Sequence, residues 1–274
     1  MQEQAIPPMP TGIVSLDPVL MGGMPPGSVI LLLGDIGAGN SEFVYSSILS
    51  LSTQKTSTQT EKKNLPEEIC YITFTKTSED VAQEMALSFH PDLVAHSSLI
   101  HYEDLSKLYF DASIVPVDWY SKTDILSRIQ SRGETTSIMA HLASQLNNVS
   151  PNSLIVLDSI TDIATQYANK PQWGEFSAFL KGLQRISKQW NSTIFLILTK
   201  GILDKRQELE IADAADAVLL FRWEETAGSR RQRIMYIEKF RGLMTHLEDR
   251  DLVKFAVKIS SSGGFEVSNI RVVL

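Results

Sequence analysis

The sequence predicts an α/β fold with a mostly parallel central sheet flanked by helices, and three observations support this prediction. Short, continuous apolar runs recur along the chain, as is typical of strands buried on both faces of a parallel sheet. Segments with apolar residues at helical spacing lie between these runs. The last third instead carries strand-like runs joined by polar turns, which indicates antiparallel strands added at one edge.

The elements can be placed in order along the chain. Buried strands are predicted at 29–33, 69–74, 153–158 and 192–198, with candidate strands at 98–102 and around 113–115. Antiparallel strands are predicted at 217–223, 233–239 and 252–259. Helices are predicted from 41 to about 51, from 78 to about 89, and at 136–147, with a further helix that carries Phe176, Phe179, Leu180, Leu183 and Ile186.

The flanking segments set the expected domain organisation. Residues 1–28 are rich in proline and glycine, which predicts a loop-rich lead-in with turns. Residues 29–274 are expected to form a single domain. Residues 52–66 are almost free of apolar side chains and cannot contribute to a core, so we expect a flexible surface loop there.

Composition limits the function classes. The net charge of −7 disfavours nonspecific attraction to nucleic acid or to an anionic membrane. No apolar run approaches the ~20 residues of a membrane helix, and the first residues lack the pattern of a signal peptide. The one cysteine, Cys70, lies in an apolar run and excludes a disulfide framework. We therefore expect a cytoplasmic protein that does not act at a membrane.

The strongest local signal for chemistry lies between the first predicted strand and helix. The sequence Gly34-Asp35-Ile36-Gly37-Ala38-Gly39-Asn40-Ser41 follows the phosphate-binding pattern G-x-x-x-x-G-K-[ST], except at one position. Glycines let backbone amides approach phosphate oxygens, the helix start adds partial positive charge, and Ser41 is placed to hold Mg²⁺. The simpler alternative is a glycine turn that only links strand to helix.

Asn40 stands where the pattern has a lysine. A neutral amide in place of the charge should cost about 1–2 kcal/mol of phosphate affinity if nothing compensates. Turnover should suffer more, because negative charge builds on the transferring phosphoryl group. The sequence therefore indicates that nucleotide binding can outlast hydrolysis, with ATP and Mg²⁺ as the expected but weak ligands.

A second candidate ligand is Asp158, which ends an apolar strand. A carboxylate at that position holds the magnesium-bound water in many nucleotide-binding proteins of this architecture. The alternative is a plain cap for the next helix. Ser41 and Asp158 are the predicted magnesium ligands.

Several motifs together resemble the KaiC-like branch of the RecA superfamily of P-loop ATPases. Thr11-Gly12-Ile13 with Leu16-Asp17, followed by 21–28, is similar to the family's signature before the loop. Lys239-Phe240-Arg241-Gly242 and Gly264-Phe265-Glu266-Val267 are similar to two motifs near its C-terminus. The motifs occur in the family's order and span residues 11 to 267, so the resemblance implies a RecA-like P-loop fold for nearly the whole chain.

The resemblance also shows where the chain departs from the family. KaiC-like ATPases have a glutamate pair that activates water after the second strand, and Thr75 and Lys76 take its place here. Neither side chain is a carboxylate base. Lys76 has two interpretations: a solvated loop lysine, or a lysine that reaches the γ-phosphate and replaces the charge missing at Asn40. The combined losses indicate an inactivated ATPase with no catalytic residues.

The resemblance further implies a homo-oligomer. In the family, the lysine and arginine that match Lys239 and Arg241 reach a neighbour's nucleotide, so these two residues are candidates for a subunit interface. The alternative is a pair of exposed charges at a strand end. The cluster of Arg230, Arg231 and Arg233 is interpreted as a solvated turn, and Trp223 as a packing residue.

The leading hypothesis is a KaiC-like pseudo-ATPase that acts as a regulatory or signalling protein, with a protein partner that the sequence does not identify. It would bind nucleotide without efficient hydrolysis. The first alternative is a slow ATPase that uses Lys76 or a partner's residue. The second is a RecA-like accessory protein of DNA recombination, which the acidic charge disfavours.

Overall fold

The computed structural model describes residues 6–56, 64–121, 137–226 and 230–270. These residues form one nine-stranded sheet in the order β3-β2-β4-β5-β1-β6-β7-β8-β9. Neighbours from β3 to β6 pair in parallel, and neighbours from β6 to β9 pair antiparallel. The predicted fold class is confirmed. The strands are β1 (Val29–Gly34), β2 (Ile69–Thr73), β3 (Ile100–Asp104), β4 (Leu154–Asp158), β5 (Thr193–Thr199), β6 (Ala217–Thr226), β7 (Arg230–Phe240), β8 (Lys254–Ser260) and β9 (Gly264–Asn269).

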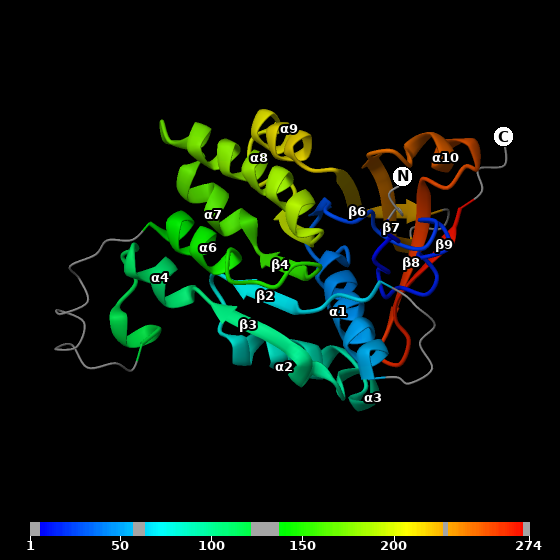
Figure 1. Ribbon diagram of the computed structural model, residues 1–274, viewed down its shortest axis with the longest axis horizontal. Coiled ribbons are helices and arrows are strands. Elements are labelled where there is room, and N and C mark those ends of the chain that lie inside the picture. The colour runs from blue at the N-terminus through cyan, green and yellow to red at the C-terminus, as the bar shows by residue number, and fades with distance from the viewer. Residues whose placement is uncertain (1–5, 57–63, 122–136, 227–229, 271–274) are drawn as a thin grey trace, which may run out of the picture.

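Helices cover both faces of the parallel part of the sheet (Figure 1). One face packs against α1 and α2, and the opposite face packs against α6 to α9. The α-helices are α1 (Asn40–Thr56), α2 (Ser78–Ser88), α3 (Pro91–Val94), α4 (Ser106–Asp111), α6 (Ile138–Leu146), α7 (Ile160–Tyr167), α8 (Trp173–Trp190), α9 (Lys205–Ala214) and α10 (Met244–Asp249). Short 3₁₀ turns lie at Ser97–Leu99 and Val117–Trp119.

Alternation along β1 explains why its sequence is apolar without interruption. Ile30 and Leu32 belong to the core on the α1 face, whereas Val29 and Leu31 belong to the core on the α8 face. Successive side chains of a strand point to opposite faces, so a strand covered on both faces needs apolar residues at every position.

The lead-in has the predicted turns, but it is also part of the core. Leu16, Leu20 and Met24 are almost completely buried and pack with α1 and the sheet. Asp17 accepts hydrogen bonds from the backbone amide and the hydroxyl of Thr11, at 2.7 and 2.6 Å. Met9 and Met24 form an isolated antiparallel bridge. The lead-in is thereby fixed against the domain.

Some predicted elements differ from the structure. Helix α1 continues to Thr56, because Leu51 and Ser52 are buried, so only 57–66 of the predicted loop follows the helix, and 57–63 lie outside the described residues. The candidate strand around 113–115 is absent, since Ile114 is fully exposed and has no core to join. Residues 106–111 before it form α4. Helix α2 is capped by Thr77, in a capping box with Asp80.

No helix within the described ranges has both the length and the apolar character needed to cross a bilayer.

Candidate functional site

The phosphate-binding sequence lies where strand β1 passes into helix α1. Gly34 is the last residue of β1, and Asn40 is the first residue of α1. Strand β1 lies in the middle of the sheet between β5 and β6, so the loop occupies the carboxyl edge of the parallel strands. In open parallel sheets this edge is where ligands bind.

Glycines allow the loop to turn its amides outward. Gly37 and Gly39 adopt φ of 71° and 111°, values that strain other residues. Within the described residues, the backbone amides of Gly37, Gly39, Asn40 and Ser41 donate to no protein acceptor, whereas Ala38 donates to the carbonyl of Asp35 at 3.0 Å. Successive free amides at a helix start form a cradle for an anion. The predicted loop residues are therefore brought together as a phosphate site requires.

Asn40 packs back over the end of β1 rather than outward. A Cβ atom added to Gly34 would lie 2.8 Å from the Asn40 Cγ atom, and Asn40 is only 9% exposed. The residue that replaces the family's lysine thus fills space inside the loop. It presents a neutral amide there, and its short side chain brings no positive charge to a bound phosphate.

The outer side of the loop is held by β6 and β7. Trp223 donates its indole N–H to the carbonyl of Ile36 at 3.2 Å, and Arg233 Nε donates to the carbonyl of Gly37 at 3.1 Å. The guanidinium groups of Arg231 and Arg233 lie 4.7 and 4.5 Å from the centre of the Trp223 ring. The predicted turn is wrong, because these arginines belong to strand β7. Arg231 is exposed, as predicted, and Arg233 is half-buried beside the loop.

Asp158 ends β4, next to Thr73 of β2, and its carboxylate is buried. Tyr71 donates its hydroxyl to Asp158 Oδ2 at 2.6 Å. Burial raises the pKa of Asp158, although the nearby Lys76 charge and the Tyr71 hydrogen bond oppose the shift. The predicted carboxylate is at the predicted strand end, but one of its oxygens is already engaged within the chain.

Lys76 lies between two carboxylates. Its Nζ atom is 2.8 Å from Glu84 Oε2 and 3.9 Å from Asp158 Oδ2. Tyr45 also donates to Glu84, at 2.7 Å. Burial alone would lower the pKa of Lys76, but Asp158 and Glu84 outweigh it and the pKa is raised, so the ammonium stays charged. The interpretation as a solvated loop lysine is wrong, because the side chain is ion-paired and only 36% exposed.

Thr75, the other replacement, offers a hydroxyl in place of a carboxylate. It donates to Asp162 Oδ2 at 3.5 Å, and Ser159 donates to the same oxygen at 2.8 Å. Asp162, in the first turn of α7, is therefore the carboxylate that the fold brings to this position. It comes from a different element than the glutamate pair that the family resemblance leads one to expect.

Sequence reasoning did not find the residues that surround Lys76 and Asp158. Tyr71, Tyr45 and Glu84 come from β2, α1 and α2 and meet only in the folded chain. One signal was present, because a tyrosine inside a strand buried on both faces must find a partner for its hydroxyl. Asp158, the predicted polar residue on a neighbouring strand, is that partner.

Lys239 and Arg241 both have partners within the chain. Lys239 Nζ donates to the carbonyls of Ala212 and Asp213 at the end of α9, each at 3.0 Å. The Arg241 guanidinium lies 3.1 Å from Asp216 Oδ1. Both side chains therefore have polar partners within a single subunit. Their role at a subunit interface stays a prediction.

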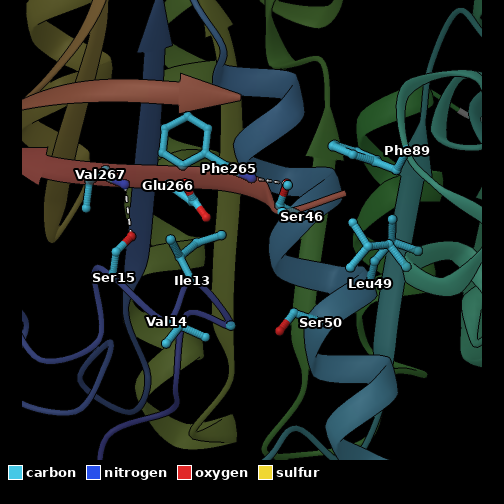
Figure 2. A pocket seen from close by; sticks show the side chains of 14 residues that line it. Ile13, Val14, Ser15, Ser46, Leu49, Ser50, Phe89, Phe265, Glu266 and Val267 are labelled. Carbon is cyan, nitrogen blue, oxygen red and sulfur yellow. Dashed lines mark hydrogen bonds between the residues drawn. The ribbon is translucent and has the colours of Figure 1, made fainter. Parts of the chain in front are cut away.

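A separate cavity of about 410 Å³ lies farther along α1 (Figure 2). It is bounded by the lead-in, α1 and β9, and no residue of 34–41 lines it. As Figure 2 shows, β9 is tied to both neighbours: Phe265 donates its amide to Ser46 Oγ, and Val267 donates its amide to Ser15 Oγ, each at 2.9 Å. The cavity therefore lies where the last strand closes over the first helix.

Comparisons with known proteins agree with this geometry. The family model of the KaiC ATPase matches residues 9–268. A solved structure, the KaiC-like protein PH0186 from the archaeon Pyrococcus horikoshii, is similar with a TM-score of 0.58 and 18% identity, over 94% of this chain and 97% of that chain. No curated protein matches the sequence. Since the family model covers nearly the whole chain, the protein belongs to the KaiC ATPase family, with a RecA-like P-loop fold.

Proposed function

We propose that the protein binds a nucleoside triphosphate at residues 34–41, hydrolyses it inefficiently or not at all, and acts as a regulatory or signalling protein. The observation that carries the binding is the loop itself. Four amides, from Gly37, Gly39, Asn40 and Ser41, have no acceptor in the described chain and lie at the start of a long helix. Such amides bind phosphate oxygens without a lysine, although more weakly.

Weak hydrolysis follows from the groups that face the loop's edge of the sheet. A general base must reach the attacking water and accept its proton. Thr75 has no carboxylate, and the Asp162 oxygen beside it already accepts hydrogen bonds from Ser159 and Thr75. Lys76 keeps its proton because Asp158 and Glu84 stabilise the charged form. Asn40 adds no charge to stabilise the transferring phosphoryl group. Bound nucleotide would therefore persist, as suits a protein that senses nucleotide rather than consumes it.

Magnesium fits this site poorly. Ser41 offers a hydroxyl in the first turn of α1, but Asp158 is the other predicted ligand, and its Oδ2 accepts from Tyr71 at 2.6 Å and faces the Lys76 ammonium at 3.9 Å. Mg²⁺ needs near-ideal octahedral oxygen ligands and gives up its waters reluctantly. The binding proposed above therefore rests on the amides of the loop.

Gly37 provides a matched test of binding. A side chain added there meets no atom within 4 Å, and Asn and Asp both tolerate its positive φ. We expect Gly37→Asn to keep the ATP affinity measured by isothermal titration calorimetry. Gly37→Asp should weaken it roughly 5–30-fold, because one added negative charge beside a phosphate costs on the order of 1–2 kcal/mol.

Two results would contradict the proposal. If titration of the unaltered protein with millimolar ATP released or absorbed no heat, the proposal of nucleotide binding would be refuted. Phosphate release at about 1 per second or faster, the range of ordinary enzymes, that is lost in a Ser41→Ala, Asp158→Ala variant would instead show that the protein hydrolyses ATP efficiently at this site. The calorimetric and phosphate assays thus test the two halves of the proposal separately.

A further inference from the structure

The ammonium of Lys76 lies beside Asp158, the carboxylate that the sequence predicts as a magnesium ligand. It is 2.8 Å from Glu84 and 3.9 Å from Asp158, and it comes from the segment between β2 and α2. Tyr71 and Tyr45 donate hydroxyl hydrogen bonds to the same two carboxylates. Two carboxylates, two phenols and one cation therefore form a compact network.

This network leaves the Asp158 carboxylate little capacity to bind a divalent ion. The side chain is 11% exposed, and one oxygen is held by the Tyr71 hydroxyl. A metal ion at that carboxylate would lie close to the Lys76 ammonium, and like charges a few ångströms apart repel strongly where water is largely excluded. Across the residues that the structure describes, no three His, Cys, Asp or Glu side chains gather as a metal-binding group.

We propose that Lys76 is the built-in cation of this site and that it takes the place of a divalent metal ion at Asp158. Its ammonium neutralises the buried carboxylate, and Glu84 holds the ammonium in position through a direct ion pair. A consequence for nucleotide binding rests on the proposed function: a triphosphate at residues 34–41 binds without Mg²⁺, because the Lys76 ammonium occupies the place of the metal ion at Asp158.

The first test uses Mn²⁺ alone and needs no nucleotide. Free Mn²⁺ is measured by electron paramagnetic resonance in solutions of the unaltered protein and of Asp158→Asn. We expect the same affinity for both, because Asp158 contributes no metal site. Lys76→Gln removes the charge at nearly constant side-chain length. This variant should bind Mn²⁺ at least about tenfold more tightly than the unaltered protein does, because a nearby like charge has been removed. Lys107→Gln, an exposed lysine on α4, is the matched control and should gain nothing.

The proposal would be overturned if Asp158→Asn bound Mn²⁺ more weakly than the unaltered protein. This comparison does not depend on the folding of Lys76→Gln. A folded Lys76→Gln variant that gains no Asp158-dependent site would overturn it as well. In the second test, ATP affinity of the unaltered protein should change less than about threefold between Mg²⁺ and a chelator, and that of Lys76→Gln should fall without Mg²⁺. If the unaltered protein binds no ATP at all, the proposed function fails while the Mn²⁺ comparison still decides the role of Lys76.

Discussion

Asp216 joins three parts of the domain, and its removal should destabilise the fold measurably. The residue is 6% exposed and lies just before β6. Its Oδ2 accepts from the backbone amide of Val29 at 3.1 Å, and its Oδ1 accepts from Gln184 at 3.1 Å. Lys188 and Arg241 are each 3.1 Å from the same Oδ1. We consider the substitution Asp216→Ala.

The expected loss can be worked out contact by contact. The buried Val29 amide would have no acceptor, which costs roughly 1–3 kcal/mol. Lys188 and Arg241 have side chains that are 47% and 57% exposed, so they can return to water. Each of these exposed ion pairs contributes only about 0.2–1 kcal/mol. We therefore expect Asp216→Ala to lower the free energy of unfolding by about 2–4 kcal/mol.

Asp216→Asn separates the hydrogen bond from the charge. The Asn carbonyl can still accept from Val29, so this variant should lose only about 1 kcal/mol. Both values are measured by urea denaturation followed by circular dichroism. An Ala variant within about 0.5 kcal/mol of the unaltered protein would refute the reasoning, since the amide penalty alone should exceed that. Equal losses for Ala and Asn would show that the charge, and not the Val29 hydrogen bond, carries the stability.

Three further predictions address the thiol, the interface candidates and the core. Burial raises the pKa of Cys70 to about 12, so only roughly 10⁻⁴ of the thiol is ionised at pH 8. A disulfide-exchange reagent should therefore label Cys70 only after unfolding. Rapid labelling of the folded chain would contradict this. If Lys239 and Arg241 reach a neighbouring subunit, replacing both with Ala should lower the sedimentation coefficient of an oligomer, and an unchanged value would remove the interface hypothesis. Phe43→Ala should cost about 3–5 kcal/mol in urea denaturation, because its fully buried ring contacts three other aromatic rings, and a loss below about 1 kcal/mol would be incompatible with that packing.

The sequence predicts the central strands well because their environment imposes a simple pattern. Strands β1 and β4 are buried at every position, and an unbroken apolar run is the direct result. Helix α9 was not predicted because it is largely polar and buries few apolar side chains, chiefly Ile211 and Ala214. Its start is instead fixed by a capping box between Asp204 and Gln207, a signal that is short and easily missed.

The site was predictable only where its residues are neighbours in the sequence. Residues 34–41 follow a contiguous pattern, and the strand before them fixes their place. The partners of Lys76 lie on separate elements, since Glu84 is on α2 and Asp158 on β4. Whether a lysine is solvated or ion-paired depends on packing of this kind. No local pattern could therefore reveal the ion pairs of Lys76, which neither interpretation from the sequence included.

Asn40 and Lys76 both replace groups that a P-loop ATPase needs for hydrolysis. A P-loop ATPase needs a positive charge at the phosphates and a carboxylate that accepts a proton. Here the loop position carries a neutral amide, and the position expected for a glutamate carries an ammonium held by Glu84 and Asp158. An ammonium can stabilise a bound polyanion, but it cannot take a proton from water while its pKa is raised. The departures at positions 40, 75 and 76 together thus leave the loop amides to bind phosphate while removing the lysine charge and the glutamate base, which is the physical basis for proposing binding without turnover.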